Sequence, residues 1–239
     1  MNSEVRQIPL ALDPGPKHLL SDYIPGPNAL ARQAVKAAAT SSELAWPFLW
    51  GASGTGKTHL LSGCVQAAGA AGKDALYIPG RRLAEQDPAY LESLEGFAVV
   101  ALDDIDALVG QSQWDLALFG LYNRVKDSGG VLVTAARTGL AQLQPSLPDL
   151  RSRLRWGSAF NLTALSDDDK VQVLMDRAKA LEYRVTPEVS RYLMRHYSRN
   201  LKSLVGLLNE LETATLVHKR RLTVSFLKAH LKQTQESSS

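Results

Sequence analysis

Uninterrupted apolar runs alternate with stretches of helical periodicity from the start of the chain to about residue 162. The runs predict buried strands at Phe48–Trp50, Ala75–Ile78, Val99–Leu102, Val131–Thr134 and Ala159–Leu162. Because each run is apolar at successive positions and a helical stretch separates it from the next, the pattern is typical of a parallel sheet that helices cover on both faces. We therefore expect an α/β fold class with a five-stranded parallel sheet.

The C-terminal part of the chain has a helical pattern alone. Ser166 is followed three residues later by Asp169, which is the spacing of a capping box, and Thr186 before Pro187 is typical of a second helix start. A fourth helix is expected to begin near Thr223. The third helix is predicted from leucines that recur on one face: Leu201, Leu204, Leu208 and Leu211.

Composition and charge narrow the class of protein. The 239 residues are 45% hydrophobic and 21% charged, which is ordinary globular usage, and 27 basic against 24 acidic residues give no general polyanion-binding character. The single Cys64 cannot form an internal disulfide and is expected to be a small buried side chain. The first residues lack the features of a secretory signal, and no apolar stretch is long enough to cross a bilayer. We expect a cytoplasmic protein with no membrane partner.

The stretch GASGTGKT, residues 51–58, lies between a predicted strand and a helical stretch and fits the pattern G-x-x-x-x-G-K-[ST]. In such a loop backbone N–H groups surround phosphates, Lys57 reaches the β- and γ-phosphate oxygens, and the Thr58 hydroxyl ligates Mg²⁺. A purely structural glycine-rich turn is the alternative, and the complete pattern favours a nucleotide. The predicted nucleotide-binding residues here are Gly51, Ser53, Gly54, Thr55, Gly56, Lys57, Thr58 and His59.

A second motif supplies carboxylates. The apolar strand that ends at Leu102 is followed by Asp103 and Asp104, and the stretch resembles a Walker B motif. Asp103 is expected to hold Mg²⁺ through water, and Asp104 takes the place of the acidic residue that orients the attacking water in catalysis. Two carboxylates after a strand are, by themselves, more often a helix cap or a solvated loop. Their position after a P-loop favours the metal site.

A P-loop α/β domain followed by a small helical domain is the layout of AAA+ ATPases, which this chain resembles. The resemblance implies a P-loop AAA+ domain with a five-stranded parallel sheet and a C-terminal helical lid. The expected parts are an extended N-terminal arm at 1–20, the α/β nucleotide-binding domain at 21–163, the lid at 164–235 and a polar tail at 236–239.

Two further stretches resemble the bacterial initiator DnaA. In DYIPGPNALARQAV, Tyr23, Ile24 and Asn28 take the places of residues that in DnaA pack against the base and ribose, although an entry loop with Asn28 as a helix N-cap is the alternative. In LPDLRSRLRWG, the resemblance implies that Arg153 is an arginine finger acting in trans on the nucleotide of a neighbouring subunit. A planar, permanently charged guanidinium suits the spread-out charge of phosphoryl transfer. The flanking Arg151 and Arg155 are expected to be solvated or to contact a partner's acidic side chains.

Over its whole length the chain resembles the Hda family of DnaA regulatory inactivators. That family carries an N-terminal peptide that binds the β sliding clamp of DNA polymerase III, and the similar residues here are Gln7, Ile8, Pro9, Leu10, Ala11 and Leu12. Gln7 offers an amide, and Leu10 and Leu12 are apolar anchors. A chain terminus that is frayed or packed on the domain is the alternative.

The resemblance implies a function and a set of cofactors and partners. A nucleotide-bound protein on the clamp would stimulate hydrolysis of DnaA-bound ATP through Arg153 and so prevent re-initiation. The implied cofactors are ADP or ATP, with the diphosphate as the working state, and Mg²⁺. The implied partners are DnaA, the clamp and, through the clamp, DNA, and a homodimer is an open expectation. Intrinsic ATPase activity is left open.

Some residues depart from the family pattern. Lys202 stands where the lid of DnaA has an arginine, so that γ-phosphate sensing is expected to be weaker, because an ammonium lacks the fork of a guanidinium. Ala136 replaces an aspartate of relatives, and Thr134 is a weak candidate for a polar sensor. The alternative functions are an autonomous AAA+ ATPase such as a helicase loader, and a DNA-binding initiator, for which the basic stretch 218–221 is the one basic cluster in the sequence.

Overall fold

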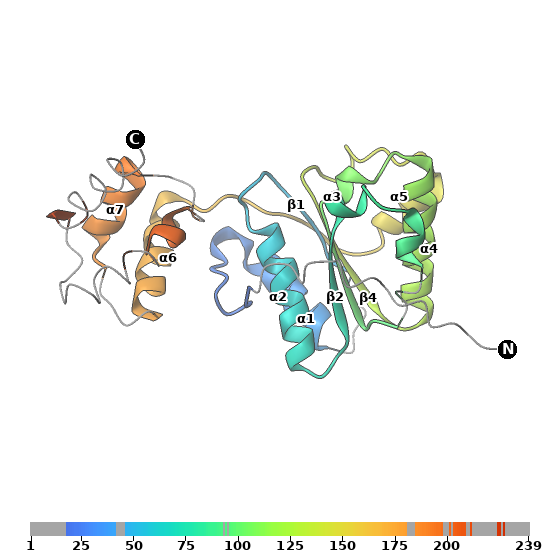
Figure 1. The fold of residues 1–239 in the computed structure, drawn as a ribbon, viewed down its shortest axis with the longest axis horizontal. Helices are drawn as coiled ribbons and strands as arrows, with labels where there is room; N and C mark the ends of the chain where they lie inside the picture. The colour runs from blue at the N-terminus through green and yellow to red at the C-terminus, as the bar shows by residue number, and fades with distance from the viewer. Residues whose placement is uncertain are drawn as a thin grey trace. The chain divides into compact units, whose positions relative to one another are not determined.

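The computed structural model describes residues 18–41, 46–92, 94, 96–180, 185–197, 201, 203–208, 211, 224–225 and 227. The chain divides into two compact units, with the division between Ala164 and Leu165. The first unit is an α/β domain, and the second is built of helices (Figure 1).

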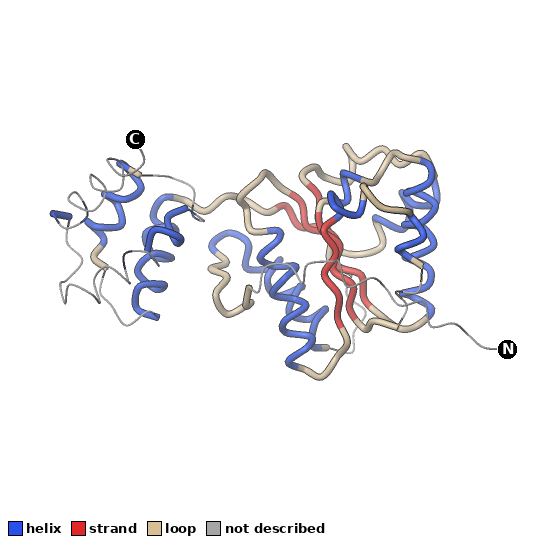
Figure 2. The backbone as a smooth tube through the Cα atoms, in the orientation of Figure 1, coloured by secondary structure: helices blue, strands red, loops and turns tan. Residues whose placement is uncertain are grey.

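The sheet of the first unit has five parallel strands in the order β2-β3-β4-β1-β5 (Figure 2). Their bounds are β1 (Phe48–Trp50), β2 (Ala75–Pro79), β3 (Val99–Asp103), β4 (Val131–Ala136) and β5 (Ala159–Asn161). The five strands lie where the apolar runs predicted them, and the predicted fold class is confirmed. Because all strands run the same way, the loops that follow β1 and β3 leave the sheet at the same edge.

Helices cover both faces of this sheet (Figure 1). Along β3, Val99 and Ala101 pack in the cluster with α1 and α2, whereas Val100 and Leu102 pack in the cluster with α4 and α5. This two-sided burial explains why the strand is apolar at successive positions. The helical elements of the unit are η1 (Gly26–Asn28), α1 (Ala29–Thr40), α2 (Lys57–Ala70), α3 (Gly80–Leu83), η2 (Pro88–Leu91), η3 (Ile105–Ala107), α4 (Ser112–Asp127) and α5 (Pro148–Leu154).

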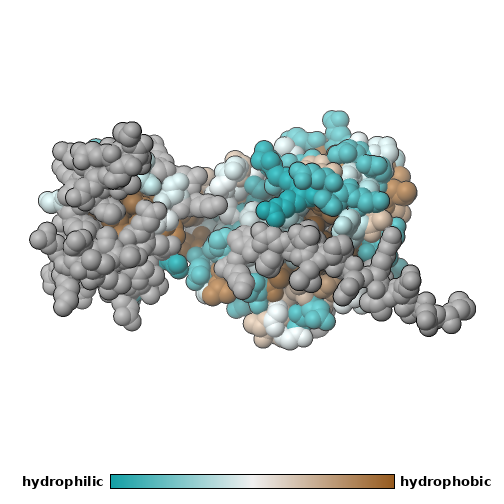
Figure 3. Space-filling model, viewed as in Figure 1, coloured by the Kyte–Doolittle hydropathy of each residue, from teal (hydrophilic) through white to brown (hydrophobic). Residues whose placement is uncertain are grey.

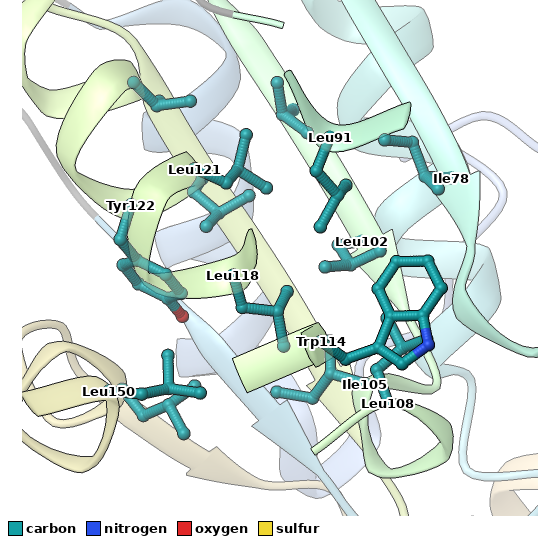
Figure 4. Close-up of a cluster of buried hydrophobic side chains, with 14 of the residues drawn as sticks. Ile78, Leu91, Leu102, Ile105, Leu108, Trp114, Leu118, Leu121, Tyr122 and Leu150 are labelled. Carbon is teal, nitrogen blue, oxygen red and sulfur yellow. The ribbon is translucent and has the colours of Figure 1, made fainter. Parts of the chain in front are cut away.

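The core on the α4 side fixes the strand ends that carry the motifs. Trp114 and Leu118 of α4 lie against Leu102 and Ile105, which flank the acidic pair, and all are at most 1% exposed (Figure 4). Full burial of one such side chain stabilises a fold by about 1.5–3 kcal/mol. On the other face Cys64 is buried, and burial raises the pKa of its thiol to about 12, so the prediction of a small buried side chain is confirmed.

The second unit contains α6 (Asp167–Ala180) and α7 (Pro187–His196). The predicted capping box is present, because the Asp169 N–H donates to Ser166 Oγ at 3.1 Å and the Ser166 N–H donates to Asp169 Oδ2 at 3.0 Å. Thr186 caps α7 by accepting from the N–H of Val189 at 3.4 Å. Both helix starts are therefore confirmed.

Residues 203–208 of the second unit are also helical, and their apolar side chains pack with those of α6 and α7. Leu204, Leu208 and Leu211 are buried and Leu201 is partly buried, which confirms the predicted leucine face. On the face of the first unit that Figure 3 shows, hydrophilic side chains gather over part of the described surface, and apolar side chains lie beside them. Within the described parts of the chain, no helix has both the length and the apolar character needed to span a membrane.

Candidate functional site

The structure brings the P-loop and the acidic pair together at one edge of the sheet. The loop follows β1 and leads into α2, and Asp103 is the last residue of β3. The Thr58 hydroxyl donates to Asp103 Oδ2 at 2.6 Å, although the two residues are 45 positions apart in the chain. The predicted Mg²⁺ ligand and the predicted metal carboxylate are therefore direct neighbours.

The P-loop contains glycines with positive φ, and two of them lie well within the left-handed region. Gly54 has φ +82° and Gly56 has φ +95°, a region in which side chains other than glycine are strained. A Cβ on Gly56 would also lie 2.7 Å from the Tyr23 ring. Gly56 is the N-cap of α2 and leaves the backbone N–H groups at the start of this helix without a side-chain cap, which is the arrangement that suits a bound phosphate.

The Lys57 side chain turns back over the loop. Its Nζ donates to the carbonyl of Gly51 at 2.7 Å and to that of Ala52 at 2.9 Å, and the residue is only 7% exposed. Burial lowers the pKa of the Lys57 amine from its ordinary value, and the nearby Asp103 carboxylate acts against that shift. Phosphate oxygens are stronger acceptors for an ammonium than carbonyls are, so a nucleotide can draw this group away from the loop.

The Asp103 carboxylate is buried and accepts three hydrogen bonds. Oδ2 accepts from Thr58 and from the Tyr77 hydroxyl at 3.0 Å, and Oδ1 accepts from the Asp104 N–H at 2.9 Å. Burial raises the pKa of the Asp103 carboxyl, and the hydrogen bonds from Thr58 and Tyr77 act in the opposite direction. Sequence reasoning missed Tyr77, although a tyrosine in an otherwise aliphatic strand next to β3 is a usable signal.

Asp104 has a left-handed backbone conformation, and its carboxylate is paired with an arginine. Its φ is +45°, and it is the one residue other than glycine with positive φ in the described chain. Its Oδ2 accepts from Arg81 Nε at 2.7 Å, in an ion pair that is partly exposed to solvent. Such a backbone costs on the order of 1–3 kcal/mol and is retained where the surroundings hold it. The carboxylate predicted to orient the attacking water thus lies beside Asp103 and is engaged by the Arg81 guanidinium.

The N-terminal segment of the α/β unit lies beside the P-loop. Tyr23 is buried against Gly56, and its ring lies 5.4 Å from that of His59, centroid to centroid. His59 Nε2 lies 2.9 Å from the Leu19 carbonyl oxygen, and its ring stacks on that of His18. The structure therefore brings two predicted cofactor residues together next to the loop.

Asn28 is used in a contact that the sequence did not reveal. Its Nδ2 donates to the Thr163 carbonyl at 2.9 Å, and its Oδ1 accepts from the Thr163 N–H at 2.8 Å. Asn28 is the N-cap of α1, but its side chain makes no capping hydrogen bond. Ile24 is half-buried in the same segment. A contact of Ile24 or Asn28 with a base or ribose stays a prediction.

Arg153 lies near the end of α5 among aromatic side chains. Its Cζ is 4.5 Å from the centroid of the Trp156 ring and 5.6 Å from that of the Phe119 ring. Its Nε is buried without a hydrogen-bond partner among the described residues. On the same indole, Lys126 Nζ lies 4.0 Å from the ring centroid. Sequence reasoning missed this support, although a tryptophan three residues after the arginine is a signal for it.

The remaining predicted residues either lie in the sheet or fall outside the described residues. Thr134 is 2% exposed in β4 and is hydrogen-bonded to Tyr122, so it is occupied within the core. Lys202, the basic stretch 218–221 and the proposed clamp peptide at residues 7–12 lie outside the described residues.

Comparison with known families decides what kind of protein carries this site. Residues 15–161 match the bacterial DnaA ATPase domain, and residues 167–231 match the lid domain of Hda. The chain belongs to the bacterial DnaA ATPase family and carries an Hda-type lid. It is a DnaA-related AAA+ protein, as its motifs indicated. A DnaA-type ATPase domain implies nucleotide binding, and the Hda-type lid implies a role in DnaA inactivation.

Solved structures confirm the AAA+ fold. Domain III of the Thermotoga maritima replication initiation protein DnaA is similar with a TM-score of 0.74 at 19% identity, over 89% of this chain and 95% of that one. AMPPCP-bound DnaA from Aquifex aeolicus has a TM-score of 0.71 at 22% identity, over 87% of this chain and 69% of that one. The Thermotoga maritima RuvB Holliday junction branch migration motor has a TM-score of 0.66 at 19% identity, over 91% of this chain and 72% of that one. At these identities the likeness establishes the fold alone.

Proposed function

We propose that this Hda-type protein inactivates DnaA by completing the hydrolysis site of ATP that is bound to DnaA, with Arg153 as the arginine finger. The observation that carries the proposal is the placement of Arg153. Its guanidinium is held by two aromatic rings, so that no carboxylate of the described chain has to be displaced before it meets a phosphate. An arginine finger supplied in trans accelerates phosphoryl transfer by about 10³–10⁵.

The same proposal gives this protein a bound nucleotide of its own, ADP or ATP, with Mg²⁺. The site fits both groups, because the glycine loop opens at the start of α2 and the Thr58 hydroxyl lies 2.6 Å from Asp103. Lys57 would bind phosphate oxygens, Thr58 would ligate the metal, and Asp103 would hold it through water. When bound, Mg²⁺ neutralises charge on the phosphate oxygens.

The acidic pair suggests that the protein's own hydrolysis is slow. Asp104 is the residue in position to orient an attacking water, and Arg81 engages its carboxylate at 2.7 Å. A carboxylate held in this way is less able to accept a proton from water. We therefore favour ADP as the working state, in which the nucleotide is a structural ligand.

The N-terminal peptide at residues 7–12 would bind the DNA polymerase sliding clamp and, through it, place the protein near DNA in the cytoplasm. Once the peptide is bound to the clamp, the rest of the protein is held near DnaA at a high effective concentration, so two weak contacts together bind more tightly than either one alone. Clamp binding would thereby confine the inactivation of DnaA to the period after replication has begun.

The decisive experiment measures hydrolysis of DnaA-bound ATP in the presence of clamp-loaded DNA. Arg153→Ala is expected to lower the stimulated rate by about 10³ or more, because the transition-state charge loses its guanidinium. Arg155→Ala, an exposed neighbour on the same segment, is the comparison variant. It is expected to keep most of the stimulated rate at saturating protein, because a contact with acidic side chains of the partner affects binding rather than the phosphoryl transition state. Nucleotide and clamp binding should be intact in both variants. Full stimulation by Arg153→Ala would remove the finger from the mechanism.

An autonomous AAA+ ATPase is the second candidate, and the complete P-loop with Lys57 and the Thr58–Asp103 pair favours it. In that case the purified protein would turn over ATP without DnaA, and Lys57→Ala would abolish the turnover. We expect instead that turnover is at least tenfold below the typical enzymatic value of about 10 s⁻¹. A steady-state phosphate-release assay decides between the two. A DNA-binding initiator would instead bind duplex DNA with a steep salt dependence.

A further inference from the structure

Tyr77 brings a phenol hydroxyl to the predicted metal carboxylate. It lies in β2 and pairs with Ala101 of β3, two residues before Asp103. The residue is only 8% exposed, and its ring packs in the apolar cluster on the α2 side of the sheet. Its hydroxyl nevertheless reaches Asp103 Oδ2 at 3.0 Å. An apolar side chain would fill the same place in the core, so the hydroxyl needs an explanation of its own.

The three groups that donate hydrogen bonds to Asp103 differ in how firmly the fold holds them. Thr58 belongs to the phosphate loop, is exposed, and is the residue that would ligate Mg²⁺. The Tyr77 hydroxyl and the Asp104 N–H instead come from the sheet and from the backbone that follows it. These two donors hold one carboxylate oxygen each. Together they define the plane of the carboxylate whether or not Thr58 is engaged elsewhere.

We propose that Tyr77 is a positioning residue for the Mg²⁺ site, which holds the Asp103 carboxylate facing Thr58 before the metal arrives. Groups that hydrogen-bond to metal-holding residues typically contribute about 10–100-fold to metal affinity, because they fix orientation in advance. The inference rests on the proposed binding of a Mg²⁺ nucleotide at Thr58 and Asp103. It concerns the coupling between metal and nucleotide, and it is independent of DnaA and of the clamp.

A merely structural role would give a different result. If the Tyr77 hydroxyl only satisfied a buried carboxylate, its removal would lower the free energy of unfolding and leave the effect of Mg²⁺ on nucleotide affinity unchanged. If the hydroxyl positions Asp103, its removal weakens nucleotide binding when Mg²⁺ is present and leaves nucleotide binding in EDTA unchanged. The informative quantity is therefore the ratio of the ADP dissociation constants measured in EDTA and in Mg²⁺.

The experiment measures this ratio for the full chain with a fluorescent ADP analogue. Tyr77→Phe is expected to reduce the ratio by about tenfold while the dissociation constant in EDTA stays at the wild-type value. Tyr122→Phe is the matched control, because Tyr122 is also a buried tyrosine with a side-chain hydrogen bond, but on the α4 side of the sheet (Figure 4). It should leave the ratio unchanged. Thr58→Ala sets the ratio expected when the metal site is lost.

The outcomes separate this inference from the proposal on which it rests. A wild-type ratio of one would overturn the Mg²⁺ site and the role of Tyr77 together. A large wild-type ratio that Tyr77→Phe retains would overturn the role of Tyr77 alone. Should Tyr77→Phe fail to fold, fluorotyrosine incorporated at position 77 gives a second readout. Its fluorine NMR signal is expected to shift when Mg²⁺ is added to the ADP-bound protein, and an unchanged signal would count against the proposal.

Discussion

At the scale of the residue, Arg153 shows how a half-buried cation can be held by aromatic rings, with no carboxylate partner among the described residues. Its guanidinium lies 4.5 Å from Trp156 and 5.6 Å from Phe119, and contacts of this kind contribute about 0.5–2 kcal/mol, depending on how far water is excluded. An acidic partner would hold the side chain more strongly but would compete with phosphate for the same donors. Aromatic faces orient the guanidinium and leave its outer N–H groups for a phosphate.

The aromatic support predicts an effect of Trp156 on Arg153, the proposed arginine finger. Trp156→Ala removes the closer of the two rings and is expected to lower stimulated DnaA ATP hydrolysis by about tenfold, which corresponds to a loss of about 1.4 kcal/mol in the orientation of Arg153. Trp156→Phe keeps a ring at this position and should restore most of the rate. The measurement is the single-turnover rate at saturating protein. An alanine variant that is as fast as wild type would show that the ring does not position Arg153.

At the scale of the element, the strands follow directly from the pattern of the sequence, whereas their cross-links do not. Val99–Asp103 is apolar at successive positions because two helical layers bury it, and this is a local property of the sequence. The P-loop, the helix caps and the leucine face of the second unit are local patterns as well. The pairing of Asn28 with Thr163 joins residues 135 positions apart in the chain. The hydrogen bond from Tyr77 to Asp103 joins the neighbouring strands β2 and β3. No short-range periodicity encodes such contacts.

The Asn28 pairing predicts a stability effect in the α/β unit. Asn28→Ala removes both hydrogen bonds to the backbone of Thr163. Thr163 is exposed, so water can reach the freed N–H and C=O groups, and each lost bond costs about 0.5–1.5 kcal/mol. The free energy of unfolding, measured in urea, is expected to fall by about 1–3 kcal/mol. Thr40→Ala, an exposed site on α1, is the control and should have little effect.

The same variant separates the two roles considered for Asn28. If its amide serves Thr163 alone, ADP affinity measured well below the unfolding transition stays at the wild-type value. A large loss of affinity in a folded Asn28→Ala protein would instead show that the residue contacts the nucleotide. Asn28→Asp retains the acceptor for the Thr163 N–H and loses the amide donor, so it should be destabilised less than the alanine variant.

At the scale of the whole molecule, the proposed function needs parts that act on different partners. The P-loop unit would hold the protein's own nucleotide, α5 would offer Arg153 to DnaA, and the peptide at residues 7–12 would bind the clamp. Each part has its own assay, and a substitution in one should leave the other two intact. This independence makes the proposed architecture testable by combining variants, because effects at separate, unconnected sites are expected to add.

The last prediction concerns residues 7–12, the proposed clamp-binding peptide. Replacing Gln7 and Leu10 by alanine removes the amide and one apolar anchor, and the protein is expected to lose retention on clamp-loaded DNA, as measured by co-elution. Without the tether, half-maximal stimulation of DnaA ATP hydrolysis should require about 10²–10⁴-fold more protein, while the rate at saturation is unchanged, because the tether raises effective concentration and leaves Arg153 untouched. Arg153→Ala should do the reverse: retention stays normal and the rate at saturation falls. A double-alanine variant that co-elutes normally and stimulates at wild-type concentration would show that clamp binding, if it occurs, uses another surface.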